Sequence, residues 1–296
     1  MISRTDFNGN QTTYVYDLAR NLETSRTEGL DATGSATSVT RTIATQLHPQ
    51  WKLPQQITVH TGTTSTGIPI KRTKYTYNAQ GHATSITEED PVLVQSRTTA
   101  ISYIYSTAVP GLILQKVVNG PRSDVNDIVT YNYYPHDASC TASSNGSSAI
   151  NLGCRGQLLS ITDALGKVTQ FSRYNHYGQL EENVDPNNVA TTYTYDKRQR
   201  LLSYNKTSES MTLSYDATGQ ITQLTLPDTS TLNFTYDDAH RLTDIQDTLG
   251  NKVHYSLDQM GNRVQEDYTD LQRNLAKIIT RSYDALNRLQ ALIGQD

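Results

Sequence analysis

The chain has 296 residues and a net charge of −4 at pH 7, and only 18% of its residues are charged. This balance excludes the basic surface typical of nucleic-acid-binding proteins, and no apolar run approaches the ~20 residues of a membrane-spanning helix. The first residues, Met1–Asp6, contain no apolar segment of a signal peptide. The chain has 19 Tyr and about forty Thr, residues that favour strands. The composition therefore predicts an all-β protein.

The glycines mark a recurring turn. Asp or Asn opens such a turn by accepting a hydrogen bond from the backbone two residues on, and Gly closes it in the left-handed conformation. Asp and Asn together make up 40 of the 296 residues, so chance would place roughly two of the 17 glycines three residues after one of them. Eight are found there: Gly9, Gly34, Gly81, Gly166, Gly178, Gly219, Gly250 and Gly261.

A seven-residue unit surrounds many of these turns, with Tyr at position one, Asp or Asn at position two, and Leu or Ile at position seven. In chain order its first copies begin at Tyr16 and Tyr77, while residues 23–72 and 84–155 fit the unit poorly. Two segments there resemble worn copies that lost the Asp: Tyr103-Ile104-Tyr105 and Tyr131-Asn132-Tyr133.

Two cysteines bracket a loop at the end of this degenerate half. Cys140 and Cys154 enclose a segment rich in Ser, Asn and Gly, which can bury little apolar surface. A disulfide would stabilise such a loop by roughly 3 kcal/mol, and it would indicate an exported protein. The alternative is two unrelated small residues near a loop. We expect the disulfide.

The second half of the chain, residues 156–296, repeats regularly. Copies of the unit begin at Tyr174, Tyr195, Tyr215, Tyr236, Leu257 and Tyr283, and the first five are 20 or 21 residues apart. A second kind of turn lies between copies, so each period holds two strands of ~6 residues. In Tyr193-Thr194-Tyr195 the two rings would share one face. This pattern predicts a long antiparallel meander, of about 28 strands over the whole chain at ~10.5 residues each.

The residues expected to build the repeat share the first, second and fifth positions of the unit. They are Tyr16, Asp17, Tyr174, Gly178, Tyr195, Asp196, Tyr215, Asp216, Gly219, Tyr236, Asp237, Gly261, Tyr283 and Asp284. Four copies lack Gly at position five and carry Arg20, Gln199, His240 or Asn287 instead. Asn and His tolerate positive φ, whereas Arg and Gln suggest a different turn at those two places.

The repeated unit resembles the YD repeats of Rhs proteins, which also occur in the C component of Tc toxins and in teneurins. The resemblance covers residues 160–292, and residues 1–22 and 75–83 as single copies. It implies one continuous repeat domain, degenerate over 1–155 and regular over 156–296, that spirals into a hollow shell or wide open barrel. In bacterial members such a shell encloses a C-terminal toxin.

The resemblance sets the expected function: a structural scaffold of a secreted or cell-surface polymorphic toxin, with no catalysis of its own. Its expected partners are the toxin domain or the remainder of the shell, and its free sheet edges favour self-association. The alternative is a carbohydrate- or receptor-binding module, in which Arg200, Arg241 and Arg288 form a ladder with Tyr rings. Their recurrence at the repeat period favours a structural role, as turn caps or as partners of Tyr rings.

No catalytic, metal or cofactor site is expected. The seven histidines never lie at metal-ligand spacing. The pairs Asp237-Asp238 and Glu181-Glu182 could be acid/base pairs, but we interpret them as solvated charges. The self-cleavage segment of bacterial Rhs shells, an Asp-Pro-x-Gly context, is not matched by Asp90-Pro91 or Asp185-Pro186.

Overall fold

The computed structural model of the chain describes residues 2–6, 8–138 and 153–295. In this part of the chain every regular element is a strand, so it contains no helix that could cross a membrane. The strands fall into two compact units, with the division at Thr169 and Gln170.

The first unit holds eleven strands, most of them longer than those of the second. They are β1 (Ile2–Thr5), β2 (Gln11–Asp17), β3 (Leu22–Leu30), β4 (Ala36–Leu47), β5 (Pro54–Thr61), β6 (Lys71–Tyr77), β7 (Ala83–Asp90), β8 (Gln95–Tyr105), β9 (Ile113–Asn119), β10 (Ile128–Tyr133) and β11 (Leu158–Thr162).

The second unit holds the regular repeats. Its strands are β12 (Val168–Tyr174), β13 (Leu180–Val184), β14 (Ala190–Tyr195), β15 (Leu201–Lys206), β16 (Glu209–Tyr215), β17 (Ile221–Thr225), β18 (Thr231–Tyr236), β19 (Leu242–Asp247), β20 (Lys252–Leu257), β21 (Arg263–Thr269), β22 (Leu275–Tyr283) and β23 (Leu289–Gln295).

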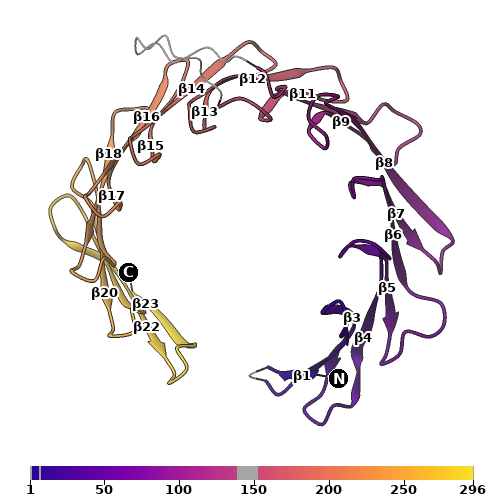
Figure 1. Cartoon of the computed structure of the whole chain (residues 1–296). Coiled ribbons are helices and arrows are strands. Elements are labelled where there is room, and N and C mark those ends of the chain that lie inside the picture. The colour runs from indigo at the N-terminus through magenta and orange to yellow at the C-terminus, as the bar shows by residue number, and fades with distance from the viewer. Residues whose placement is uncertain (1, 7, 139–152, 296) are drawn as a thin grey trace. The chain divides into compact units, whose positions relative to one another are not determined.

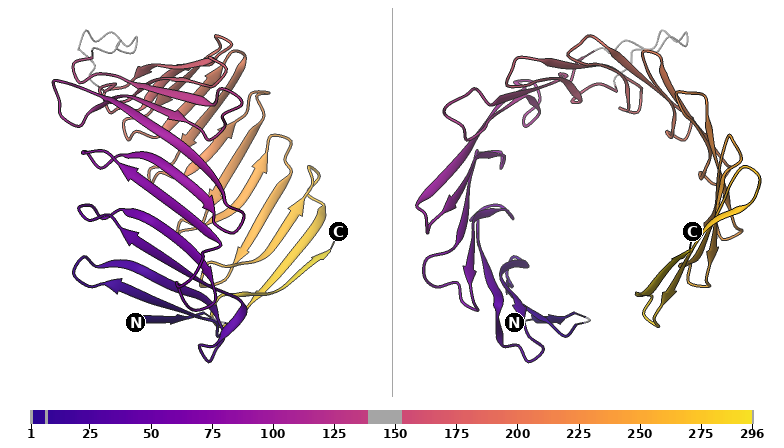
Figure 2. Two further views of the ribbon diagram at one scale, coloured as in Figure 1. Left: turned by 90° about the vertical axis from the view of Figure 1, so that its right-hand side faces the viewer. Right: turned by 180° about the vertical axis from the view of Figure 1, so that it is seen from behind.

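Within each unit every strand pairs antiparallel with the next one along the chain, which confirms the predicted meander (Figure 1). Because consecutive strands alternate in direction, the turns gather along two opposite edges of each unit's sheet (Figure 2). The seven-residue units form the turns of one edge, and the second kind of turn forms the other.

The strand alternation separates two chemically different faces in the second unit. Directly opposed residues on one face, which we call the tyrosine face, form continuous rows: Tyr193–Tyr204–Met211, Leu213–Leu224–Leu232 and Phe234–Ile245–Val253–Tyr268. The other face, the threonine face, carries rows such as Ser203–Thr212–Thr225–Thr231. The predicted sharing of one face by Tyr193 and Tyr195 follows from the same registers.

A β-bulge recurs beside position one of the unit. In the hairpin of β14 and β15, Thr194 lies opposite Ser203 but Tyr195 lies opposite Leu201, so Leu202 is the extra residue. The same one-residue shift occurs next to Tyr77, Tyr215, Tyr236, Leu257 and Tyr283. A bulge bends its strand and increases its twist. Because the bulge recurs in every seven-residue repeat, it accounts for the curvature of the sheet in each of the two compact units (Figure 1).

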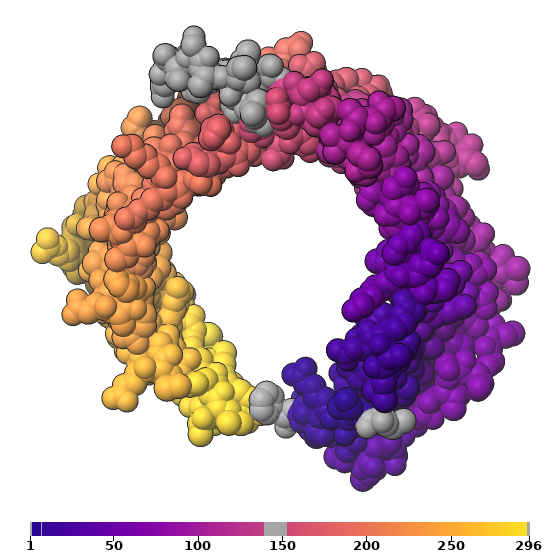
Figure 3. Space-filling model, in the orientation of Figure 1, coloured from indigo at the N-terminus to yellow at the C-terminus, as the bar shows by residue number. Residues whose placement is uncertain are grey.

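Each unit is a layer one sheet thick (Figure 3). Among the described residues only four apolar side chains are buried, namely Leu30, Cys154, Tyr174 and Tyr255. The chain exposes 18665 Å², whereas a compact protein of 33.0 kDa would expose about 12,500 Å². The apolar side chains of the tyrosine face are therefore half-buried by their neighbours and lack a covering layer.

The strand count is lower than predicted. The described residues form 23 strands, not about 28, since the first unit departs from the 21-residue period. Its strands β4 and β8 have 12 and 11 residues. Its connections are also long, as between β5 and β6.

Candidate functional site: the turn belt

The Asp at position two organises each turn through its own backbone neighbours. Asp196 Oδ1 accepts hydrogen bonds from the backbone N–H groups of Arg198 (2.8 Å) and Arg200 (2.9 Å). The backbone closes the same loop, because Gln199 N donates to Asp196 O and Asp196 N donates to Arg200 O. This is a type I turn followed by a left-handed residue, a common three-residue hairpin loop.

The Tyr at position one joins each unit to the preceding one. Its hydroxyl donates to the backbone carbonyl at position seven of the previous unit: Tyr195 to Leu180 (2.8 Å), Tyr215 to Leu201 (2.7 Å), Tyr236 to Ile221 (2.8 Å) and Tyr283 to Arg263 (3.2 Å). Neighbouring hairpins are not joined by a turn at this edge of the sheet; β13 and β14, for example, are joined at the opposite edge. The hydroxyl closes the open end between two hairpins.

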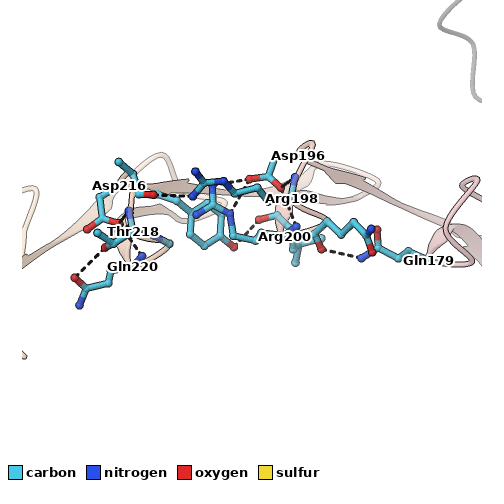
Figure 4. A network of polar contacts seen from close by, with 12 residues as sticks. Gln179, Asp196, Arg198, Arg200, Asp216, Thr218 and Gln220 are labelled. Carbon is cyan, nitrogen blue, oxygen red and sulfur yellow. Dashed lines mark hydrogen bonds and ion pairs between the residues drawn. The ribbon is translucent and has the colours of Figure 1, made fainter. Parts of the chain in front are cut away.

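Position six joins each unit to the following one. Gln179 Nε2 donates to Gln199 O at 2.8 Å (Figure 4). Gln220 Nε2 donates to His240 O at 2.7 Å. Three further contacts continue the series: the Arg200 guanidinium over the Tyr215 ring (4.3 Å), Arg241 Nη1 to Asp258 O (3.0 Å) and Asn262 Nδ2 to Asn287 Oδ1 (3.0 Å). We call this chain of contacts the turn belt. The turn belt links the turns of all six seven-residue repeats in the second compact unit.

The recurring arginines cap their own turns, and Arg200 and Arg241 also belong to the turn belt. Arg200, Arg241 and Arg288 each bond Oδ2 of the Asp four residues earlier, at 2.6 to 2.7 Å. Arg200 also stacks on Tyr215. Both features, a turn cap and a ring partner, were expected from the period.

The turn contacts lower the pKa of the turn carboxyl groups below the ordinary value. For Asp196 the largest cause is the hydrogen bond from the backbone of Arg200. For Asp216 it is the Thr218 hydroxyl, and for Asp237 it is the Arg241 side chain. The hydrogen bonds from these donors stabilise the ionised form of each carboxylate.

The predicted repeat residues of the described structure lie at recurring places in the strands and turns. A register shift lies beside each predicted Tyr: Tyr16, Tyr174, Tyr195, Tyr215, Tyr236 and Tyr283. All but Tyr16 are the last residue of their strand. The predicted Asp residues accept hydrogen bonds from their own turns: Asp17, Asp196, Asp216, Asp237 and Asp284. Gly178, Gly219 and Gly261 all have positive φ.

One prediction about position five is wrong. Gln199 was expected in a different turn, but it adopts φ 65° in the same turn as the glycines, as His240 and Asn287 do. Two backbone bonds and the Asp196 carboxylate fix this turn, so an ordinary residue is forced into the left-handed region. Arg20 does depart from the pattern, because its turn is one residue longer and Asn21 takes the positive φ.

Three of the four carboxylates in the two acidic pairs, those of Glu181, Glu182 and Asp237, have partners in the described structure. Glu181 is the extra residue of a bulge, and it lies 3.5 Å from Arg173, which also lies 3.4 Å from Glu182. Burial raises the pKa of Glu181. Asp237 is bonded within its turn. No group of three His, Cys, Asp or Glu side chains with metal-binding geometry exists among the described residues.

The cysteine pair is only half described. Cys154 is 1% exposed at the start of the turn that precedes β11, and Cys140 lies outside the described residues. The disulfide stays a prediction.

The first compact unit has the same kinds of hydrogen bond at its turns, but some of them are made by different residue types. Tyr77 donates to Pro54 O (2.6 Å), and His82 at position six bonds the Tyr105 hydroxyl (2.7 Å). In the worn copy after Tyr105, Ser106 Oγ replaces the Asp carboxylate and accepts from the backbone of Ala108 (3.2 Å).

Position six and the hydroxyl bond of Tyr were missed by the sequence reasoning. The signal for position six was present as the series Gln179, Arg200, Gln220, Arg241, Asn262 and Arg288, all long or amide side chains. Their partners are about 20 residues away, and local turn chemistry does not reveal them.

The hydrogen bond between the Tyr236 hydroxyl and the carbonyl of Ile221 should contribute to the stability of the fold. We expect Tyr236→Phe to lower the free energy of unfolding by about 1 kcal/mol, because the half-buried carbonyl of Ile221 loses its donor. Leu257 occupies position one without a hydroxyl, so Leu257→Tyr should raise stability. Urea unfolding followed by circular dichroism measures both.

The matched control is Tyr204→Phe on the tyrosine face, whose hydroxyl makes no hydrogen bond within the described ranges. It should leave stability unchanged. Equal losses from Tyr236→Phe and Tyr204→Phe would contradict the link between units.

Comparisons with known proteins agree with this geometry. The family model described as RHS Repeat matches residues 215–252 and 236–272. The comparison with curated proteins yields no match.

Several solved structures share the fold. One is a crystal structure of TcdB2-TccC3-TEV, with a TM-score of 0.61 and 15% identity over 96% of this chain. Another is the Tc holotoxin pore of Photorhabdus luminescens with a TccC3 variant, with a TM-score of 0.57 and 15% identity over 98% of this chain. The chain spans 15% of the length of each of those chains.

Proposed function

We propose that this chain, which matches the RHS Repeat model over residues 215–252 and 236–272 and shares the fold of Tc toxin structures, is a wall of an RHS shell that holds a toxin polypeptide against its tyrosine face. The observation that carries the proposal is the uncovered row structure of that face in the second unit. Tyr, Leu, Phe and Ile side chains meet across eight strands, and no second layer of the described chain covers them.

The tyrosine face suits a non-native polypeptide better than a single small ligand. Burial of its aliphatic rows by a bound polypeptide would stabilise the complex by about 25 cal/mol per Å² of apolar surface, and this contribution does not depend on the orientation of the bound groups. Several tyrosine hydroxyls add polar groups to the same face. A cargo segment could then bind in many registers, whereas a specific ligand site requires converging polar groups around one pocket.

The proposed wall has no catalysis of its own. The carboxylates of the turn belt are saturated with donors, as for Asp196 and Asp237, which leaves them poor proton carriers. The chemistry of the toxin would belong to the cargo.

We propose a bacterial toxin that is secreted or displayed at the cell surface as the setting. The support is the likeness to Tc toxin structures, together with the buried Cys154 as one half of the predicted disulfide. The partners are the cargo and further strands that complete the wall.

The carbohydrate-binding alternative depends on free arginines beside tyrosine rings. The guanidinium groups of Arg200, Arg241 and Arg288 are already bonded to turn carboxylates. No feature of the described residues favours this alternative over the shell.

Binding of an unfolded reporter polypeptide tests the proposal. Leu224→Glu places a charge on the tyrosine face, and Gln223→Glu places the same charge on the threonine face of the same strand. Both side chains are half-buried, which makes the pair matched. We expect Leu224→Glu to weaken fluorescence-detected binding of reduced, carboxymethylated polypeptide at least ~10-fold, and Gln223→Glu to leave it unchanged.

Circular dichroism of both variants checks that each remains folded. Equal binding by both folded variants, or no binding by the unmodified chain, would overturn the proposal.

A further inference from the structure

Strand β8 of the first unit is longer than the strand that follows it, and part of β8 has a partner on one side only. Residues 95–100 pair with β7, whereas the pairing with β9 begins at Ala100, which lies opposite Asn119. Among the described residues no second strand pairs with residues 95–99. We call these five residues the free edge of β8. Such an edge presents backbone N–H and C=O groups that can pair with a further strand.

The free edge lies inside the sheet and not at its margin. Both neighbours of β8 are present, and β9 occupies the adjoining position as far as Asn119. The free edge exists because β9 has seven residues and β8 has eleven. It is therefore not a place where further strands would widen the wall.

The sequence after β9 prevents the chain from covering the free edge itself. Continuing the register beyond Asn119 would place Pro121 opposite Thr98 and Arg122 opposite Arg97. Pro donates no backbone hydrogen bond to a ladder, and like charges directly opposite each other destabilise a pair of strands. A partner for the free edge must therefore be a different segment.

The connection from β9 to β10 is held by other contacts. The backbone N–H of Arg122 donates to Asp127 Oδ2 within the connection (2.9 Å). Asn126 Nδ2 donates to Ala164 O in the turn after β11 (3.1 Å). No hydrogen bond of the described chain joins this connection to the free edge.

Arg97 gives the free edge a positive charge that no carboxylate neutralises. The residue opposite Arg97 on β7 is Glu88, whose Oε1 lies 2.9 Å from Lys71 Nζ. Arg97 is exposed and makes no ion pair within the described part of the chain. Opposite charges across two strands stabilise their pairing and like charges destabilise it. The free edge therefore favours a partner strand with a carboxylate opposite Arg97. It disfavours a second copy of itself, in which two Arg97 side chains would meet.

The turn beside the free edge exposes three consecutive apolar residues. Val92, Leu93 and Val94 are 63%, 65% and 89% exposed. Val94 has φ 54°, which is an outlier for a β-branched residue. Strained residues cluster at sites that bind ligands, and exposed apolar patches mark contact surfaces. A strand added beside residues 95–99 would continue past this turn.

From these features we infer that the free edge of β8 binds an extended acidic polypeptide segment as an added antiparallel strand. A carboxylate of the segment lies opposite Arg97. The segment runs antiparallel to β8, so its C-terminal end passes Gln95 and places apolar side chains against Val92–Val94. In this mode of recognition the backbone ladder gives affinity and the side chains give specificity.

This inference goes beyond the proposed function and does not depend on it. The free edge belongs to the first unit, whereas the tyrosine face proposed to hold cargo belongs to the second. Leu224→Glu should leave binding of a short acidic peptide unchanged, so the two proposals can fail separately.

Fluorescence anisotropy of the full chain with a labelled peptide, Thr-Thr-Glu-Thr-Thr-Val-Leu, tests the inference. We expect this peptide to bind, and a second peptide with Lys in place of Glu to bind about 10-fold more weakly, because Lys then lies opposite Arg97. Arg97→Glu should reverse this preference, since the opposite charges are restored with the Lys peptide. Circular dichroism checks that the variant remains folded.

Lys52→Glu is the matched control, because Lys52 is an exposed cation in the connection between β4 and β5 of the same unit. It should keep the preference of the unmodified chain for the Glu peptide. Two further peptides, N-methylated at alternate residues, test the ladder on the unmodified chain: only the set whose N–H groups face β8 should abolish binding.

Four results would each overturn the inference: no binding of the Glu peptide, an unchanged preference in folded Arg97→Glu, loss of the preference in Lys52→Glu, or equal binding of the two N-methylated peptides.

Discussion

Replacing Gly219 with Val should lower the free energy of unfolding by about 2–3 kcal/mol. Gly219 has φ 106°, a conformation that a β-branched residue adopts only with strain. A Cβ atom there would also lie 3.3 Å from Nη1 of Arg200, the side chain that stacks on Tyr215. The substitution therefore strains the turn and disturbs the turn belt. Urea unfolding of the full chain measures the loss.

The reciprocal change isolates the backbone contribution. Gln199 holds φ 65° at the equivalent position, so Gln199→Gly should stabilise the protein by up to ~1 kcal/mol. A Gly219→Val variant as stable as the unmodified chain would refute the turn assignment. So would a Gln199→Gly variant that is less stable.

Acid should unfold the protein cooperatively below about pH 4, the second large effect. The turn carboxyl groups have lowered pKa values in the folded chain: Asp6, Asp31, Asp185, Asp196, Asp216, Asp228, Asp237, Asp247, Asp258, Asp270 and Asp284. A lowered folded pKa stabilises the folded state above the unfolded value of 3.8. That contribution is lost as the pH falls through the folded pKa values.

A pH titration of unfolding by circular dichroism measures this effect, and Asp216→Asn supplies the comparison. Asn at position 216 can still accept from the backbone of Thr218 and Gln220 but does not titrate, as Asn175 shows in its own turn. The variant should lose less stability between pH 5 and pH 3 than the unmodified chain. A stability that is flat across this range would contradict the role of the carboxylates.

The turns and the meander could be predicted because their causes are local. An Asp or Asn at position two and a Gly at position five fix a turn through contacts within five residues, as at Asp216 and Gly219. Antiparallel pairing of consecutive strands then follows from short turns.

The contacts between units could not be predicted, because they join residues about 14 to 25 positions apart. The hydroxyl of Tyr215 bonds the carbonyl of Leu201. This bond depends on the β-bulge, which places one extra residue, Leu202 in the hairpin of β14 and β15, beside position seven. The same bulge recurs in the next hairpin and shifts position one relative to position seven there too. Spacing in the sequence does not reveal a bulge. The left-handed conformation of Gln199 has the same origin, because the surrounding turn overrides the preference of the residue.

The first unit was harder to predict because it keeps the chemistry while changing the residues. Ser106 serves as turn acceptor in place of Asp, and His82 serves at position six in place of Gln or Arg. Each substitution preserves a hydrogen bond but breaks the sequence motif.

Hydroxyl-radical footprinting of the full chain, with and without a bound unfolded polypeptide, tests the shell-wall account most directly. The account predicts that Tyr193, Leu213, Leu224 and Phe234 are labelled in the free chain, since no layer covers them, and are protected when the polypeptide binds. Residues of the threonine face should not change. Absence of labelling at these four residues in the free chain, or labelling that the bound polypeptide leaves unaltered, would contradict it.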